Sequence, residues 1–422
     1  MPDKKRTKKS KNNQSAFITL VEKHIIRRDD PRFEKIDQAS FKSKNLYNLC
    51  NYYIRQAYIH ENRYLQLNEA YEKIKGTDAY VALPRKVSNQ VILQVYHDWG
   101  AYYEAMKVWR VAKDKFLGKP KIPKYKDKQK GRGLLVYEKG AVSQDKKLTE
   151  QGIVRPSQLG IDVISEHAQE VVQVRVVARK THYVVEVIYR VPLQENKDLN
   201  SDWFLSVDLG ISNLAALTSN KDGFRATLVN GRPLKAINQF YNKQKSHYQS
   251  ILMKHGRHSS QRINEMGRKR EQRINHYLHV SSRRIIDLML EEKIGTLVIG
   301  KNKNWKQAAN MGRKNNQQFV QIPFARFIDM LTYKAKLAGI SVVIQEESYT
   351  SKCSFLDAEP VKKHPKYVGQ RIKRGLFRSA SGKSINADLN GSYNILRKVS
   401  PNAFRNRVEG AAVHPSRFIL VN

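Results

Sequence analysis

Two aspartates stand in sequence settings that suit metal-dependent chemistry. Asp208 closes the apolar segment WFLSVD two residues before Gly210, and Asp388 opens a helical pattern in NADLNGSYNI. Carboxylates far apart in sequence can meet at one edge of a sheet and hold Mg²⁺ for phosphodiester hydrolysis. Either aspartate alone is equally well explained by a turn or a helix cap. The chemistry therefore depends on the elements that would bring the two together.

The chain is strongly basic. It holds 77 Lys plus Arg against 38 Asp plus Glu in 422 residues, a formal net charge of +39. Charge of this size favours a polyanionic partner. Nucleic acid fits better than a membrane, because the cations are spread along the chain and we see neither a bilayer-spanning apolar run nor a signal peptide. Cys50 and Cys353 are the only cysteines, which fits a reducing compartment and excludes a four-cysteine zinc site.

The two halves of the chain differ in their patterning. Strand patterns at 16–27 and 134–191 bracket helical segments, which predicts a β-barrel-like domain with a helical insertion. After Trp203 come three strands in a meander and then alternating helices and strands, the order of an RNase H-like fold. The predicted fold class is thus α+β and multidomain. We expect these parts: a disordered basic arm at 1–14, the barrel domain at 15–35 and 120–200, the helical insertion at 36–119, the α/β domain at 201–400 with an irregular basic segment at 353–380, and a tail at 401–422.

Two basic clusters are candidates for phosphate contacts. One lies in the Pro- and Lys-rich segment KPKIPKYK, and the other lies on a long helix. Helical spacing puts several cations of the second cluster on one face, although a solvated face is as good an explanation for any single one. The candidates are Lys119, Lys121, Lys124, Lys126, Arg268, Lys269, Arg270 and Arg273.

The motifs of the second half resemble those of a known family. KPKIPKYK at 119–126, VDLGISNLAALT at 207–218, QIPFARFIDMLTYKAKLAGI at 321–340 and NADLNGSYNI at 386–395 resemble TnpB, the transposon-encoded RNA-guided DNA nuclease related to type V CRISPR effectors and Fanzor proteins. The resemblance implies a RuvC-type nuclease domain, a wedge-like barrel with a recognition insertion, a bound guide RNA, and Mg²⁺-dependent cleavage of target double-stranded DNA beside a short protein-read motif. It also implies a cytoplasmic, nucleoid-associated protein, or a nuclear one in a eukaryote.

Within that resemblance, Asp208 is the first catalytic aspartate and Asp388 the last, but the middle glutamate is missing. The strand TLVIG ends in Gly300, where the family places this residue. Some members carry the glutamate relocated to the next strand, and here SVVIQE ends in Glu346 and Glu347. Neighbouring strands lie about 4.8 Å apart, so a glutamate there can reach the site if Gly300 leaves the space open. Only one of the two should point inward, and we favour Glu347 slightly.

The resemblance also implies a zinc ribbon of two cysteine pairs, and here too the chain departs from the family. Of the four positions only Cys353 is a cysteine, and the others are Leu356, Arg378 and Ser381. We therefore expect no structural zinc. In the last motif, Asn390 and Asn394 lie four apart on one helix face, where they would either orient a phosphate or form part of a polar surface.

Two other functions remain open. A nuclease-dead, RNA-guided DNA-binding repressor would explain Gly300, although it would have no use for Asp208 and Asp388. A guide-independent RNase H-like nuclease or strand transferase would share only the core fold. RNA of defined length that copurifies with the protein would separate the guided functions from this last one. The sequence leaves the choice between monomer and dimer unresolved.

Overall fold

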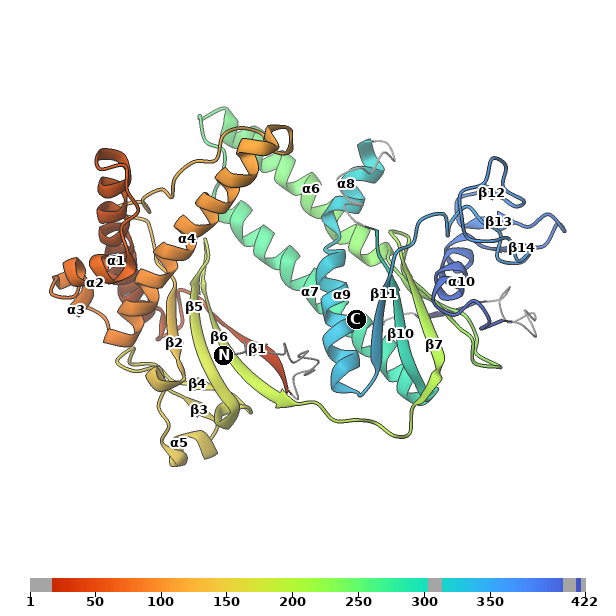
Figure 1. The fold of residues 1–422 in the computed structure, drawn as a ribbon, viewed down its shortest axis with the longest axis horizontal. Helices are drawn as coiled ribbons and strands as arrows, with labels where there is room; N and C mark the ends of the chain where they lie inside the picture. Colours follow the sequence, from red (N-terminus) through yellow and green to blue (C-terminus); the bar gives the residue numbers. More distant parts are fainter. Residues whose placement is uncertain (1–16, 303–312, 405–414, 419–422) are drawn as a thin grey trace, which may run out of the picture. The chain divides into compact units, whose positions relative to one another are not determined.

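The computed structural model describes residues 17–302, 313–404 and 415–418, and it divides into two compact units, Met1–Pro192 and Leu193–Asn422. Figure 1 shows both units, each of which combines helices with β-sheet. This mixture confirms the α+β, multidomain class predicted from the sequence. The arm predicted at 1–14 lies outside the described residues.

The helices of the first unit enclose an aromatic core. Trp99 is fully buried, and its indole N–H donates to Asn51 Oδ1 at 2.9 Å. Tyr58 packs edge-on against Trp99 with ring centroids 5.3 Å apart. The aromatic residues of these helices are therefore mainly core residues. The helices are α1 (Phe33–His60), α2 (Leu67–Ile74), α3 (Asp78–Val81), α4 (Arg85–Val111) and α5 (Lys146–Glu150), with short 3₁₀ turns at Lys113–Lys115, Lys139–Ala141 and Ala168–Glu170.

The strands of the first unit form an antiparallel sheet in the order β1-β6-β5-β2. The long first strand pairs with β6 from Phe17 opposite Pro192 to Ile26 opposite Tyr183. Since β1 and β2 form the two edges, the strands of the described residues make an open sheet here and not a closed barrel. The strands are β1 (Phe17–Ile26), β2 (Leu135–Glu138), β5 (Val171–Ala178) and β6 (Tyr183–Pro192), with a separate pair β3 (Ile153–Val154) and β4 (Val163–Ile164).

The second unit is built on a six-stranded mixed sheet in the order β11-β10-β7-β8-β9-β15. The meander β7-β8-β9 is antiparallel, whereas β10 runs parallel to both β7 and β11. Strand β15 comes from the segment predicted as a tail and adds a parallel edge to β9. The strands are β7 (Asn200–Leu209), β8 (Asn213–Ser219), β9 (Thr227–Asn230), β10 (Ile294–Gly300), β11 (Ser341–Gln345) and β15 (Ser416–Phe418).

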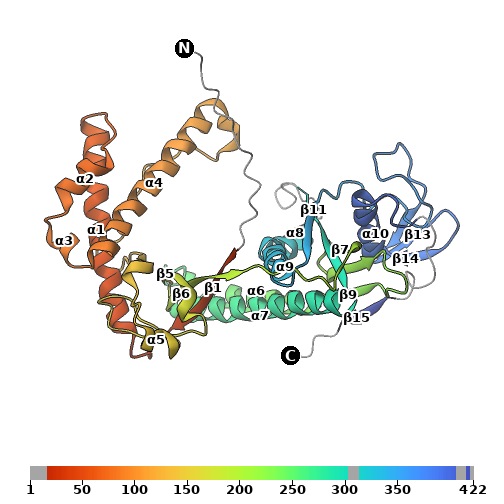
Figure 2. The ribbon, with the colours of Figure 1, turned by 60° about the horizontal axis from the view of Figure 1, so that its bottom comes forward.

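The two faces of this sheet carry different helices. Successive side chains of a strand face opposite sides of the sheet. In β7, Leu205, Val207 and Leu209 therefore face the same side, where they pack in one apolar core with residues of α7 and α9. Helix α10 packs against β7 and β8 from the other face (Figure 2). The helices are α6 (Arg232–Met253), α7 (Gln261–Glu291), α8 (Arg313–Gln321), α9 (Phe324–Leu337) and α10 (Ala387–Val399).

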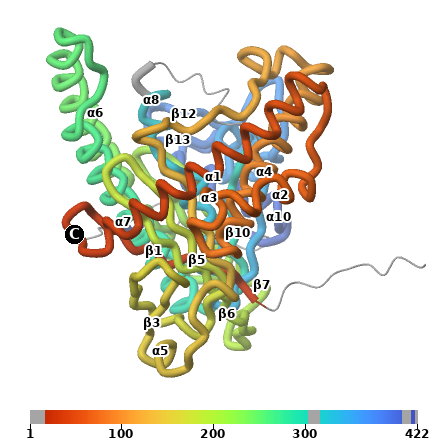
Figure 3. Tube along the Cα trace, turned by 90° about the vertical axis from the view of Figure 1, so that its left-hand side faces the viewer, coloured from red at the N-terminus to blue at the C-terminus, as the bar shows by residue number. Residues whose placement is uncertain are grey.

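Two insertions complete the unit. Helices α6 and α7 form a long helical hairpin between β9 and β10 (Figure 3). A small antiparallel sheet follows β11 and leads into α10. Its strands are β12 (Gln370–Lys373), β13 (Leu376–Arg378) and β14 (Ser384–Asn386). In the described residues, none of the helices has the length and apolar character needed to cross a bilayer.

Candidate active site

Asp208 lies on the face of β7 that meets α10. Ser206, two residues earlier on the same face, donates to the Ser392 carbonyl of α10 at 2.8 Å. A Cβ atom at Gly391 would lie 2.6 Å from Asp208 Oδ2, closer than side-chain atoms approach one another. The glycine in the NGSYN motif thus lets the helix backbone pass directly over the aspartate.

Glu347 occupies the space that the missing glutamate leaves open at Gly300. A Cβ atom at Gly300 would lie 2.7 Å from Glu347 Oε2 and 2.5 Å from Cδ1 of Ile395. Gly300 pairs with Gln345 in the parallel ladder, so Glu347 reaches back from two residues beyond that position. Its backbone N–H donates to Asn302 Oδ1 at 3.1 Å, which fixes the turn.

Glu346 has different surroundings from Glu347. Its carboxylate accepts a hydrogen bond from Lys398 Nζ at 2.8 Å and others from Ser348, and its side chain is about half exposed. The Lys398 ammonium and Ser348 hold the pKa of Glu346 below its ordinary value. Of the two acids suggested by the sequence, Glu347 is the one that lies over Gly300.

Asp388 is positioned by the start of α10. Asn386 caps this helix by accepting from the backbone N–H of Asp388 at 2.9 Å. One carboxylate oxygen of Asp388 accepts from Asn213 Nδ2 at 2.8 Å, and the other lies 3.6 Å from an Arg371 guanidinium nitrogen. Asn213 follows Asp208 by five residues in the VDLGISN motif, so its position in the sequence could have indicated that it lies near the site. Arg371 comes from the irregular basic segment, where no periodic pattern marks it.

The electrostatics of the site show that its carboxylates crowd one another. Burial, followed by the charges of Glu347 and Asp388, raises the pKa of Asp208 well above its ordinary value. Burial, followed by the charge of Glu346, raises the pKa of Glu347 to about 7. Glu347 Oε2 is buried and has no hydrogen-bond partner within the described residues. A buried acceptor without a donor costs free energy, and a cation would satisfy it.

The donor set fits a hard divalent cation such as Mg²⁺, which prefers carboxylate oxygens. Asp208 and Glu347 lie on the α10 face of the sheet, while Asp388 is held by Asn213 and Arg371. In the part of the chain that is described, no three His, Cys, Asp or Glu side chains form a ready-made metal-binding group. The carboxylates therefore converge on one region without forming a closed ligand shell, as mutual repulsion would require.

Asn390 and Asn394 are fully buried and face the segment that follows β11. Asn394 Nδ2 donates to the carbonyls of Thr350 and Cys353, and Asn390 Nδ2 donates to Cys353 as well. Asn390 Oδ1 accepts from the Phe355 N–H at 2.9 Å. These amides are structural, and neither of the two roles proposed for them from the sequence describes them.

The segment that aligns with a zinc ribbon is held by other contacts. The Cys353 sulfur is buried and lies 3.5 Å from the Lys362 carbonyl, and burial raises its pKa. His364 Nε2 lies 2.8 Å from the Pro360 carbonyl. The Glu359 carboxylate accepts backbone N–H groups at both ends of the loop. The absence of zinc stays a prediction.

The KPKIPKYK segment is fixed along α1 by its backbone. The Pro123 carbonyl accepts from Asn51 and Arg55, and the Lys126 N–H donates to Asn48 Oδ1. The side chains of Lys119, Lys121 and Lys124 are exposed, whereas that of Lys126 is half-buried and covers the Tyr47 ring. Lys119, Lys121 and Lys124 are thus accessible to phosphates, and the Lys119 ammonium also lies 5.8 Å from the Trp109 ring centroid.

The cations of α7 divide into two kinds. Arg268 pairs with Glu265 at 2.7 Å, and Arg270 donates to Asn238 Oδ1 at 2.7 Å, so both are used within the protein. Lys269 and Arg273 are exposed. The four residues therefore do not form the single solvent-facing stripe that helical spacing suggested.

Two families match the second half of the chain. Residues 182–306 match OrfB_IS605, a probable transposase, and residues 324–395 match the Cas12f1-like TNB domain. The resemblance stated from the motifs is thus confirmed: this half is similar to TnpB-like transposon proteins and type V CRISPR effectors.

Individual proteins are similar to this chain to different extents. The CRISPR-associated endodeoxyribonuclease Cas12f2 of Micrarchaeota archaeon (strain CG1_02_47_40) is 25% identical over 236 residues, 53% of this chain and 41% of that protein, so the chain spans about two fifths of the relative's length. A Cas12f1-sgRNA-target DNA complex is 14% identical, with 86% of this chain and 81% of that chain covered and a TM-score of 0.48. CasPhi-2 (Cas12j) bound to crRNA is 10% identical, with 90% and 98% covered and a TM-score of 0.44. These structural similarities are too low to assign a fold.

Proposed function

We propose that the protein is an RNA-guided DNA endonuclease whose carboxylates Asp208, Glu347 and Asp388 hold divalent metal ions. The observation that carries the proposal is the position of Glu347, whose buried and unpartnered Oε2 lies over Gly300. A chain that had simply lost its middle ligand would have no reason to bury a second acid beside Asp208, because each buried charge raises the cost of the other.

Each residue of the site has a distinct task. Asp208 would supply ligand oxygens from the carboxyl end of β7, Glu347 from the residues that follow β11, and Asp388 from the start of α10. Bound Mg²⁺ would activate a water and stabilise the leaving oxygen of the scissile phosphate. Asn213 orients the Asp388 carboxylate, and Arg371 partly neutralises it. Gly391 and Gly300 keep backbone and side-chain atoms out of the space that the carboxylates need.

The topology supports an RNase H-like, RuvC-type assignment for the second unit. A meander β7-β8-β9, followed by β10 and β11 parallel to β7, is the strand order of such a sheet, and the site lies at its carboxyl strand ends. In the first unit, the sheet β1-β6-β5-β2 would be the wedge domain, and helices α1 to α4, which lie between β1 and β2 in the chain, would be the recognition insertion. We keep the domain boundaries predicted from the sequence as part of this proposal.

Guide RNA and target double-stranded DNA are the proposed partners. The charge of +39 supports them, since an RNA scaffold and a heteroduplex both need neutralising cations. Relatives described with guide RNA and target DNA support them as well. Lys119, Lys121 and Lys124 offer exposed cations, and a short protein-read motif beside the target would complete the recognition.

The test has two parts. RNA bound after mild lysis is sequenced to define the guide, and a guide-matched duplex is then incubated with the purified complex with and without Mg²⁺. Cleavage that needs Mg²⁺, the guide and Glu347 supports the proposal. Guided binding without cleavage by the wild-type protein would instead establish the repressor function.

A guide-independent strand transferase is the second candidate, because residues 182–306 match a family described as a probable transposase. Such an enzyme would join DNA ends without RNA. Activity that survives complete removal of RNA would favour it, and loss of activity on RNase treatment would exclude it.

A further inference from the structure

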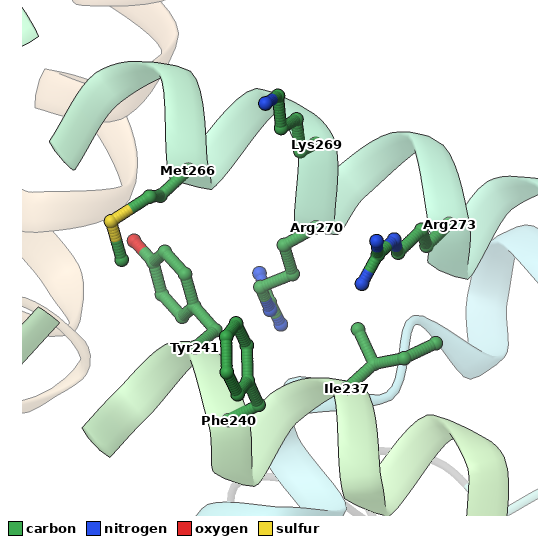
Figure 4. Close-up of a pocket in the computed structure, with 7 residues that line it drawn as sticks. All are labelled: Ile237, Phe240, Tyr241, Met266, Lys269, Arg270 and Arg273. Atoms are coloured by element: carbon green, nitrogen blue, oxygen red, sulfur yellow. The ribbon is translucent and has the colours of Figure 1, made fainter. Parts of the chain in front are cut away.

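The α6–α7 hairpin contains a pocket that the carboxylate site does not use. It has a volume of about 270 Å³. Figure 4 shows side chains of α6 and α7 meeting across it, with Arg270 directed toward α6. Apolar and aromatic residues line the α6 side, and three cations and one methionine line the α7 side: Ile237, Phe240, Tyr241, Met266, Lys269, Arg270 and Arg273.

Arg270 is fixed in this pocket by neutral partners. It donates through Nε to Asn238 Oδ1 at 2.7 Å and through Nη2 to the Gln321 carbonyl at 3.3 Å, and its guanidinium lies 5.1 Å from the Tyr241 ring centroid. Asn238 is buried, so the anchor is rigid. Neutral oxygens leave the positive charge uncompensated, in contrast to Arg268 and its Glu265 partner.

Phe240 is the second unusual feature, because its large aromatic side chain is 62% exposed. It lies beside the Arg270–Tyr241 stack at the mouth of the pocket (Figure 4). A similar stack occurs further along the same hairpin, where the Arg262 guanidinium lies 4.4 Å from the Tyr248 centroid. Seven residues of helix separate the two tyrosines, or about 10 Å. The hairpin thus carries a row of cation–aromatic platforms.

This combination selects the kind of ligand. Aromatic rings and arginine planes are the surfaces on which unpaired bases stack, and cations beside them neutralise the adjoining phosphates. The pocket falls just under the roughly 300–1,000 Å³ of drug-sized ligand sites, so one planar ring system suits it. A base inside a duplex has both faces covered by its neighbours and cannot enter.

We propose that this pocket holds one unpaired base of the RNA that the protein binds, stacked against Phe240 and the Arg270–Tyr241 pair, with Lys269 and Arg273 on its phosphates. The proposal rests on the proposed function for the existence of that RNA. RNA is preferred to DNA because a guide stays bound between turnovers, so its unpaired bases need permanent sites on the protein.

The first test is Phe240→Ala in the full-length chain, freed of nucleic acid by high salt. Its Kd is measured for a 15-nucleotide oligouridine. Loss of one stacked base should weaken binding about 5- to 150-fold, from roughly 1–3 kcal/mol per base. The salt dependence should not change, because phenylalanine carries no charge. Met253→Ala is the matched control, since Met253 is 64% exposed on the same helix but outside the pocket, and its Kd should stay within about twofold of wild type.

The second test is Arg273→Gln, which should lower the slope of log K against log salt by about 0.7, the value expected for one contact to a single strand. Arg284→Gln is its control, because Arg284 lies on the same helix and is already paired with Glu291. Its slope should match that of wild type.

The binding of Phe240→Ala to other nucleic acids decides the proposal. Equal weakening of Phe240→Ala on oligouridine and on an oligothymidine of the same length supports a base-stacking pocket, because stacking does not read the sugar. Unchanged oligouridine binding, weakening on DNA alone, or equal weakening on an RNA duplex overturns it. The proposed function is judged separately, by copurified RNA and by Mg²⁺-dependent cleavage, so either proposal can fail while the other stands.

Discussion

Glu347→Gln should stabilise the metal-free protein and abolish cleavage at the same time. Glutamine has the shape of the neutral carboxyl but no charge to bury. Burial raises the pKa of Glu347 from 4.5 to about 7, so the folded state binds this proton more tightly than the unfolded state does. Stability is therefore present at acid pH and is lost as pH rises from about 4.5 through 7.

The gain in stability expected for Glu347→Gln follows from the difference between the two pKa values of Glu347, 4.5 and about 7. At about 1.4 kcal/mol per pH unit, the ionised carboxylate costs the folded state about 3 kcal/mol at pH 8, as an upper limit, and about 1 kcal/mol at pH 5. Glu347→Gln should recover this free energy. For a unit of this size, 1 kcal/mol corresponds to roughly 2–4 °C in Tm, so a gain of several degrees is expected at pH 8 and a much smaller one at pH 5.

The assay is thermal unfolding of the full chain in EDTA at both pH values, with and without added Mg²⁺. Mg²⁺ should raise the Tm of wild type more than that of the variant, because a ligand that binds the folded state stabilises it. Glu346→Gln is the matched control: the Lys398 ion pair keeps the pKa of Glu346 low, so this variant should gain no stability and should still cut. A Glu347→Gln protein that is less stable than wild type at pH 8, or that cuts as fast, would refute this account of the site.

Four other substitutions test the site and its surroundings. Asp208→Ala and Asp388→Ala should each abolish cleavage while guided DNA binding in a gel-shift assay stays within about twofold, because only the ligand shell changes; cleavage by either variant would remove that residue from the site. Gly300→Ala should fold but cut slowly, since its methyl group must displace Glu347 Oε2 from 2.7 Å away; a rate equal to wild type would show that the carboxylate is not needed there. Elemental analysis of chelator-washed protein should find less than one zinc per chain, and Cys353→Ser should cut normally; stoichiometric zinc would contradict the metal-free interpretation of that segment.

The site was largely predictable where local pattern and topology agree. The alternation in WFLSVD and the helix start in NADLNGSYNI placed Asp208 and Asp388 on elements that the structure brings to one sheet edge. The spacing of neighbouring strands indicated that an acidic side chain after β11 can reach the space above Gly300. Glu347 occupies that space. The roles of these residues, and Gly300 as the position of the usual glutamate, came from the family resemblance, and the strand pattern gave only a slight preference for Glu347 over Glu346.

Other features depend on contacts between segments that no periodicity encodes. The pairing of Arg371 with Asp388 joins strand β12 of the small sheet to the start of α10. Burial of Asn390 depends on which face of α10 meets the loop after β11, and amphipathic spacing alone does not identify the neighbour. Arg268 and Arg270 have the same spacing as solvent-facing cations. Arg268 nevertheless pairs with Glu265 on its own helix, and Arg270 donates to Asn238 of α6.

The asparagine contacts of α10 have a mechanical consequence. Asn390 and Asn394 donate three hydrogen bonds to the chain between Thr350 and Phe355, and Asn390 accepts a fourth from the Phe355 N–H. These bonds fasten that segment to α10, and Glu347 lies three residues before Thr350. Glu347 and Asp388, 41 positions apart in the sequence, are therefore held together by α10, and hydrogen bonds between Ser206 and Ser392 fasten the same helix to β7, which carries Asp208. Fixing a free residue costs about 1–2 kcal/mol of conformational entropy. A cation that binds between the three carboxylates thus orders side chains on backbone segments that are already fastened to one another, and most of that cost has already been met during folding.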